Sequence, residues 1–199
     1  MGVSWDSRVH TAHGGPSVKR PPSVAIVVSS SSAPVQYARL SNGVVVIRVL
    51  GKGMHLQAPA VRRVFESTRD GDPTPQYVVD LEKCTSMDST FMGTLAMIGL
   101  HQRRTSGEAP IIVNADDHVR YLLNTLGLKY MFRIHGNRDE DTPTAQTGEF
   151  QAAPDVEMSL AERTAMMIEA HERLIDADSD NEVKFENVIK TLRDSLDQT

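Results

Sequence analysis

The amino-acid sequence predicts an α/β fold, a small mixed sheet with helices packed on it, followed by a C-terminal helical extension. β-prone and helical segments alternate in the order β-β-α-β-α-β-α-β over about 100 residues. Strands that alternate with helices favour a layered sheet with parallel pairing. Near the C-terminus, two amphipathic segments begin with Ser-x-x-Glu, a pattern typical of helix starts. These two observations define the predicted architecture.

The α/β part begins with a predicted hairpin. Residues 35–40 and 44–50 are β-prone, and Asn42-Gly43 lies between them. Asn-Gly readily takes the positive φ angles that a tight hairpin turn requires. After a break at Gly51–Gly53, apolar residues at helical spacing predict a helix over 57–68.

Three further strands and two further helices complete this domain. The predicted strands cover 77–81, 110–113 and 131–134, and the predicted helices cover 89–104 and 116–126. The apolar run at 77–81 is typical of a strand inside a sheet that helices cover. Because glycine readily ends a helix, Gly107 and Gly127 mark the ends of the two helices.

The chain therefore divides into four predicted parts. We expect a disordered leader at 1–34, the α/β domain at 35–136, a polar linker at 137–154 and a helical pair at 155–199. The leader is rich in Ser, Gly and Pro and has little to bury. Each helix of the pair carries an apolar stripe, and helices of this length are marginal alone. The stripes must pack on the α/β domain, on each other across a homodimer, or on a partner.

Charge argues against nucleic acid as the main partner. The net charge is -5, and residues 139–199 carry 16 acidic and 5 basic residues. Nucleic-acid binding normally needs a basic patch that releases counterions from phosphates. A mildly basic body with an acidic tail reflects either mutual attraction or a well-solvated tail.

Several function classes lack their signatures. No apolar run approaches the roughly 20 residues that span a bilayer, and the single cysteine, Cys84, cannot form an internal disulfide, which favours the cytoplasm. The histidines show no metal-ligand spacing, so we expect no cofactor and no metal. No phosphate loop or nucleophile motif appears in the sequence. We therefore expect a protein that is not an enzyme.

One segment carries a family resemblance. It reads Val78-Val79-Asp80-Leu81-Glu82-Lys83-Cys84-Thr85-Ser86-Met87-Asp88-Ser89-Thr90-Phe91-Met92-Gly93-Thr94-Leu95. The apolar strand, the Asp-Leu pair, the short loop and Met-Asp-Ser-Thr entering a helix resemble the hallmark of the STAS domain, the anti-sigma factor antagonist family. The resemblance covers about residues 36–135 and includes the order of the elements, so it implies a STAS-like fold.

The resemblance implies a phosphorylation site at Ser89. In the family, the serine after that aspartate is modified by an ATP-dependent serine kinase that is also an anti-sigma factor. The residue chemistry is compatible, because a helix N-terminus tolerates a phosphoryl group. The added charge of about -1.5 to -2 is large enough to disrupt a closely packed partner surface. The other interpretation is that Ser89 is a plain helix cap.

Two positions depart from the family pattern. Phe91 stands where the family usually has glycine, and Met54 stands where phosphorylated members often have aspartate in the turn after the second strand. The Phe91 ring changes the shape that a kinase meets, and Met54 removes a carboxylate that could pair with an arginine of the kinase. We expect the partner surface to include these residues and their neighbours: Asp88, Thr90, Phe91, Met92, Met54 and His55.

The leading hypothesis is an anti-sigma factor antagonist or a related partner-switching regulator, controlled by phosphorylation of Ser89. Its partner is then the serine kinase that serves as anti-sigma factor. A second hypothesis is a constitutive STAS adaptor or scaffold, for example a subunit of a lipid-transport complex, with no phosphorylation switch. A third is a sensor of a small ligand or nucleotide, which predicts a ligand-dependent rise in melting temperature.

Overall fold

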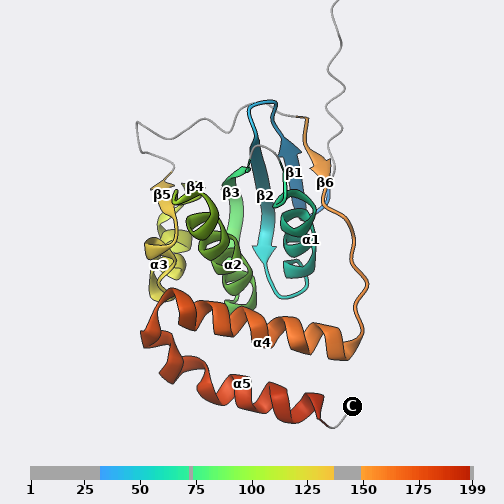
Figure 1. The fold of residues 1–199 in the computed structure, drawn as a ribbon, viewed down its shortest axis with the longest axis vertical. Helices are drawn as coiled ribbons and strands as arrows, with labels where there is room; N and C mark the ends of the chain where they lie inside the picture. Colours follow the sequence, from blue (N-terminus) through green and yellow to red (C-terminus); the bar gives the residue numbers. More distant parts are fainter. Residues whose placement is uncertain (1–31, 72–73, 137–148, 198–199) are drawn as a thin grey trace, which may run out of the picture.

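A computed structural model describes residues 32–71, 74–136 and 149–197. Figure 1 shows a sheet with α1, α2 and α3 packed along it, and a helical tail (α4, η2 and α5) lying across one end. The predicted mixed α/β fold with a C-terminal helical extension is confirmed. The predicted leader lies outside the described residues except for 32–34, as does most of the predicted linker.

In the described part of the chain, the sheet has six strands in the spatial order β5-β4-β3-β2-β1-β6. Their bounds are β1 Val35–Arg39, β2 Val44–Gly53, β3 Gln76–Met87, β4 Ile111–Ala115, β5 Arg133–Gly136 and β6 Gln151–Ala152. β1 runs antiparallel to both β2 and β6. β2, β3, β4 and β5 run parallel. The predicted hairpin forms as expected, because Gly43 adopts a φ of 82° in the turn between β1 and β2.

The helices come from the predicted segments. Their bounds are α1 Ala58–Thr68, α2 Ser89–Ser106, α3 Asp117–Thr125, α4 Leu160–Ala177 and α5 Glu182–Leu196, with short 3₁₀ turns η1 Leu128–Tyr130 and η2 Ser179–Asn181. One apolar core joins the helices to one face of the sheet. Alternate strand residues supply that face: Val45, Ile47 and Val49 lie in this core, whereas Val46 belongs to a separate cluster on the other face.

Three elements differ from the prediction. β3 extends to Met87, well beyond the predicted end, because the strand continues its pairing with β2 as far as Gly53. The turn that follows η1 occupies the first two residues of the predicted last strand, Met131 and Phe132, so β5 begins at Arg133. The linker contains β6, whose two residues pair with β1; a two-residue strand is too short to carry a periodic pattern.

The far face of the sheet carries a buried ion pair. The Asp80 carboxylate accepts hydrogen bonds from Arg48 Nε at 2.8 Å and from Asn114 Nδ2 at 3.0 Å. The Arg48 guanidinium lies 3.8 Å from the centre of the Phe150 ring, a cation–π contact. Because Asp80 is 1% exposed, these partners offset the cost of burying its charge. The aspartate of the family-like Asp-Leu pair is thus structural here.

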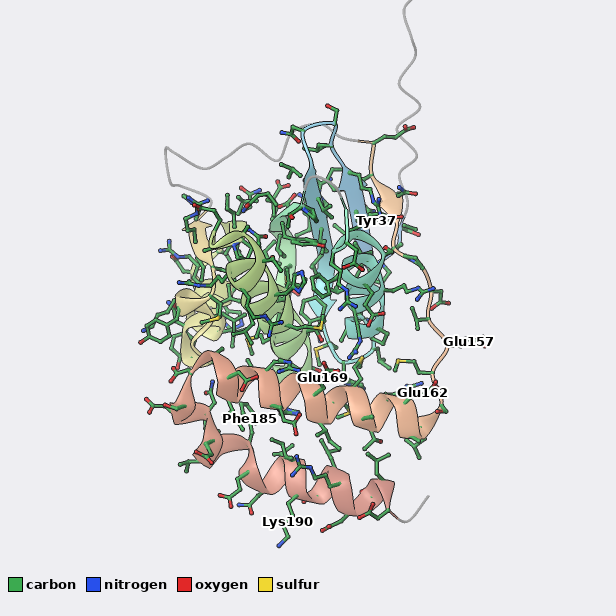
Figure 2. The ribbon with its side chains drawn as sticks, in the orientation of Figure 1. Tyr37, Glu157, Glu162, Glu169, Phe185 and Lys190 are labelled. Atoms are coloured by element: carbon green, nitrogen blue, oxygen red, sulfur yellow. The ribbon has the colours of Figure 1, made fainter. Side chains whose placement is uncertain are left out.

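The helical tail folds back on the body, which is the domain at 35–136. At its start, Ser159 and Glu162 form the predicted capping box. The second predicted capping box is wrong. Asp178 caps η2, and the buried Asn181 side chain donates to the carbonyl groups of Leu126 and Leu174. Figure 2 shows Phe185 between α4 and α5, and Lys190 pointing away from the body. Among the described residues, no helix has the length and apolarity needed to cross a membrane.

Candidate functional site at the β3–α2 junction

The junction between β3 and α2 is fixed by Asp88. Its backbone is extended, and its Oδ1 accepts a hydrogen bond from the Phe91 amide at 2.8 Å. A side-chain oxygen at this position satisfies one of the free N–H groups of the first helical turn. α2 therefore begins at Ser89, as the sequence predicts, but the interpretation of Ser89 as the helix cap is wrong, because Asp88 is the cap.

Asp88 also holds the loop between β2 and α1. Its Oδ2 accepts a hydrogen bond from the His55 amide at 2.7 Å and lies 3.2 Å from His55 Nδ1. Within this loop, the Met54 amide donates to Gln57 Oε1 at 3.1 Å. Met54, His55, Asp88 and Ser89 are all partly exposed. The structure therefore brings these four predicted residues to one corner of the molecule.

The Ser89 hydroxyl contacts the helical tail. Its Oγ lies 3.0 Å from Nε2 of His171 in α4, and His171 Nδ1 lies 2.7 Å from the carbonyl oxygen of Met167. A carbonyl can only accept, so Nδ1 carries the proton and Nε2 of the neutral ring is an acceptor. Ser89 therefore donates to His171. Burial lowers the pKa of His171, although the Met167 carbonyl and the Asp88 charge oppose the shift; the neutral ring is thereby favoured.

α4 packs closely on α2 just beyond this contact. A Cβ atom at Gly93 would lie 2.1 Å from the carbonyl oxygen of Ala170, so only glycine permits this approach. Arg62 of α1 forms an ion pair with Glu169 of α4 and a second one with Glu66. His171 lies on the buried, otherwise mostly apolar face of α4, and a histidine at such a position is the only sequence signal of the contact with Ser89.

Three of the predicted partner residues are buried in this arrangement. Thr90, Phe91 and Met92 are at most 4% exposed. The Phe91 ring fills the space beside Gly53, where a Cβ atom would lie 2.7 Å from its Cδ1. The bulky residue at the family's glycine position is thus accommodated by a glycine at the end of β2. Contact between these three side chains and a partner stays a prediction.

Sequence reasoning missed Leu56, in the same loop as His55. Its side chain is 60% exposed, and it follows directly the residue that Asp88 holds in place. Single exposed leucines are common on protein surfaces, so its position next to His55 is what makes Leu56 a candidate for partner contact. No periodic apolar pattern surrounds Leu56 in the sequence, so the sequence offers no signal that could have identified it.

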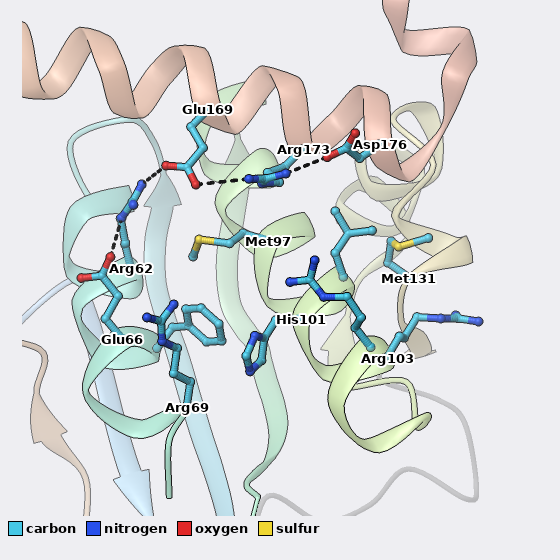
Figure 3. A pocket seen from close by; sticks show the side chains of 13 residues that line it. Arg62, Glu66, Arg69, Met97, His101, Arg103, Met131, Glu169, Arg173 and Asp176 are labelled. Carbon is cyan, nitrogen blue, oxygen red and sulfur yellow. Dashed lines mark hydrogen bonds and ion pairs between the residues drawn. The ribbon is translucent and has the colours of Figure 1, made fainter.

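A cavity of about 580 Å³ lies farther along α2, between the body and α4 (Figure 3). It is lined by side chains from α1, α2 and α4 and by residues flanking them: Arg62, Phe65, Glu66, Arg69, Met97, Leu100, His101, Arg103, Arg104, Met131, Glu169, Arg173 and Asp176. Figure 3 shows ion pairs that link Glu66, Arg62, Glu169, Arg173 and Asp176 along the side next to α4.

The remaining titratable groups define no further centre in the described part of the chain. No group of three His, Cys, Asp or Glu side chains there could hold a metal ion. Cys84 is a buried free thiol, and burial raises its pKa. The neutral thiol is therefore favoured at physiological pH.

Two solved structures are similar to this chain at low sequence identity. One is the anti-sigma factor antagonist SpoIIAA in its unphosphorylated form, with 16% identity, a TM-score of 0.44, and coverage of 54% of this chain and 91% of that chain. Another is a candidate anti-sigma factor antagonist of Thermotoga maritima, with 17% identity, a TM-score of 0.44, and coverage of 51% and 86%. No family model and no curated protein matches the sequence.

Proposed function

We propose that the protein is a non-enzymatic partner-switching regulator of the anti-sigma factor antagonist type, which binds an ATP-dependent serine kinase acting as anti-sigma factor. The observation that carries this proposal is the position of Ser89. It is the first residue of α2, directly after the Asp88 cap, at the corner where the His55 loop reaches the helix. The STAS-like motif in the sequence, Met87-Asp88-Ser89-Thr90, supports the choice of the same residue as phosphoacceptor.

The chemistry of this corner suits a switch. A phosphoryl group on Ser89 would lie beside the free N–H groups and the positive end of α2, so the fold would tolerate it. The same group adds about -1.5 to -2 charge next to Asp88, His55 and Leu56. A partner surface packed against these residues would lose affinity through repulsion and desolvation.

The helical tail adds a step to this proposal. Because the Ser89 hydroxyl donates to His171, phosphoryl transfer to this hydroxyl requires that the hydrogen bond break, and release of α4 would break it. We therefore propose two states, one with the tail docked and Ser89 bonded to His171, and one with the tail released and the Ser89 hydroxyl free to react. Binding of the kinase selects the second state.

The test is phosphorylation by the cognate kinase with ATP, in the full chain. Wild type and Ser86→Ala should incorporate phosphate, and Ser89→Ala should not; Ser86 is the matched control because it lies three residues away at the end of β3. Equal labelling of Ser89→Ala and wild type contradicts the site assignment. Ser89→Glu should weaken kinase binding, and an unchanged affinity contradicts the switch.

A second candidate function is a constitutive adaptor or scaffold without phosphorylation, such as a subunit of a lipid-transport complex. The contact between Ser89 and His171 favours it, since the hydroxyl already has a structural role. The two functions differ in their partners: co-purification of a serine-kinase ATPase supports the switch, and of a transporter subunit supports the adaptor. A homodimer through the tail helices stays a prediction, as does the cytoplasm, which the buried free thiol of Cys84 favours.

A further inference from the structure

The cavity between the body and the tail has an apolar floor. Phe65 of α1, Met97 and Leu100 of α2, and Met131 after η1 line it on the body side, and α4 closes it from the other side (Figure 3). His101 packs its edge against the Phe65 ring, with the ring centres 5.0 Å apart. The volume of about 580 Å³ lies within the range of small-molecule sites, roughly 300–1,000 Å³.

The charges around the cavity are separated. Arg62 and Arg173, next to α4, share the Glu169 carboxylate. On the body side, Arg104 forms no ion pair within the described part of the chain, and Arg103 donates to the backbone carbonyl of Tyr130 rather than to a carboxylate. The cavity thus has one neutralised side and one side with excess positive charge.

Arg69 adds to the positive side. Its only carboxylate neighbour among the described residues is the exposed Asp70, at 3.7 Å. The pKa of His101 is lowered, first by burial and then by the charges of Arg69 and Arg104. Both guanidinium groups therefore act on His101, so an anion on this side of the cavity would meet positive charge. Arginine is well suited to bind phosphate or carboxylate through paired N–H groups.

We propose that this cavity binds an amphipathic organic anion, with an apolar body on the floor and a single phosphate or carboxylate head group at Arg69 and Arg104. The bound anion contacts α1 and α2 on one side and α4 on the other, so it binds the molecule with the tail docked. By linkage, the ligand shifts the population toward that state. The part of this inference that concerns Ser89 rests on the proposed function; ligand binding itself does not.

The first experiment is titration of the full chain with octyl phosphate and octanoate, at matched ionic strength and below their micelle concentrations. Both should raise the melting temperature and slow hydrogen exchange of the amides across α4, whereas inorganic phosphate and octanol should do neither. The two amphiphiles distinguish a phosphate from a carboxylate head group. The Arg69→Gln/Arg104→Gln variant should bind the preferred amphiphile about tenfold more weakly, because two charge-assisted contacts are lost.

Arg63→Gln is the matched control, since Arg63 is an exposed arginine of α1 that does not line the cavity. Leu100→Trp should also weaken binding, because the new indole ring would fill the cavity while Arg69 and Arg104 stay in place. No binding by either amphiphile, equal binding by the double variant and wild type, or an equal effect of inorganic phosphate would overturn the site. Binding without slower exchange in α4 would overturn the coupling to the tail.

The outcome can be separated from that of the proposed function. Titration and hydrogen exchange need no kinase, so loss of Ser89 labelling in the kinase assay leaves the ligand site intact. Where labelling of Ser89 occurs, the preferred amphiphile should slow it in wild type and leave it unchanged in Arg69→Gln/Arg104→Gln. Equal slowing in both proteins contradicts ligand control of the tail.

Discussion

Gly93 of α2 and Ala170 of α4 bring two helix backbones into direct contact. A side chain as small as a methyl group at position 93 would overlap the Ala170 carbonyl oxygen, 2.1 Å away. This contact lies one turn from the Ser89–His171 hydrogen bond. The position of the tail over Ser89 thus depends on the absence of one Cβ atom.

Gly93→Ala should release the tail. In an isolated helix, alanine is more favourable than glycine by roughly 1 kcal/mol, but here the new methyl group requires the backbones to separate. We expect faster hydrogen exchange throughout α4 and a lower free energy of unfolding in urea. Thr105→Ala, on the exposed end of α2, serves as the control. Unchanged exchange in α4 of Gly93→Ala would show that the two helices are not held at this point.

Asp88 should be more important than a simple helix cap. Asp88→Ala removes the cap of α2 and also the acceptor for the His55 amide, whereas Asp116→Ala removes only the cap of α3. A lost cap costs about 1 kcal/mol, and a lost second acceptor adds a similar amount. Urea denaturation should therefore give Asp88→Ala the larger loss. Equal losses would mean that the hydrogen bond to the loop contributes nothing.

Docking of the tail should weaken at acidic pH. Burial lowers the pKa of His171 below its ordinary value of 6.5, so between the lowered pKa and 6.5 the unfolded or released state binds more protons than the docked one. The stability that His171 contributes is complete above pH 6.5 and is lost as the pH falls through the lowered pKa. Protonation also prevents Nε2 from accepting the Ser89 hydrogen bond.

The measurement is hydrogen exchange of α4 at pH 7.5 and 5.5, corrected for the intrinsic pH dependence of exchange. The pKa of His101 is lowered as well, and the Asp88 charge near His171 opposes the shift. We therefore compare wild type with His171→Gln. The pH-dependent part of tail release should be smaller in the variant; an identical pH dependence would assign it to other groups.

The ion pair between Arg62 and Glu169 should contribute modestly to docking. Both side chains are about one third exposed, so we expect a coupling energy of about 0.5–1 kcal/mol from a double-mutant cycle of Arg62→Gln and Glu169→Gln. The readout is the free energy of tail opening from native-state exchange. The pair of Arg173 and Asp176 lies within α4, and its cycle should show no coupling in that readout.

Local features could be predicted from the sequence because local chemistry decides them. Asn42-Gly43 defines the hairpin, and Asp88 defines the start of α2 because its side chain suits an N-terminal cap. The capping box at Ser159 follows from the same kind of chemistry. Each of these features involves residues within three or four positions of one another.

Contacts between distant segments could not be predicted. An apolar stripe on α4 shows that the helix must pack, but it does not show on which surface. The packing of α4 on α2 and the hydrogen bond from Ser89 to His171 could therefore not be predicted. Phe91 looked like a defect of the motif because its partner, Gly53, comes from another element. Asn181 likewise looked like part of a capping box, but tertiary contacts engage its side chain.

The strand β6 determines how far the tail can move. Its residues pair with β1, the Ala153 amide donates to the Val35 carbonyl at 2.9 Å, and Phe150 packs under Arg48. Residues 153–159 alone connect this anchor to α4, so a released α4 stays close to its site at an effective concentration of the order of millimolar. A free partner at micromolar concentration must therefore outcompete a tethered rival, and the covered state is restored quickly once that partner dissociates.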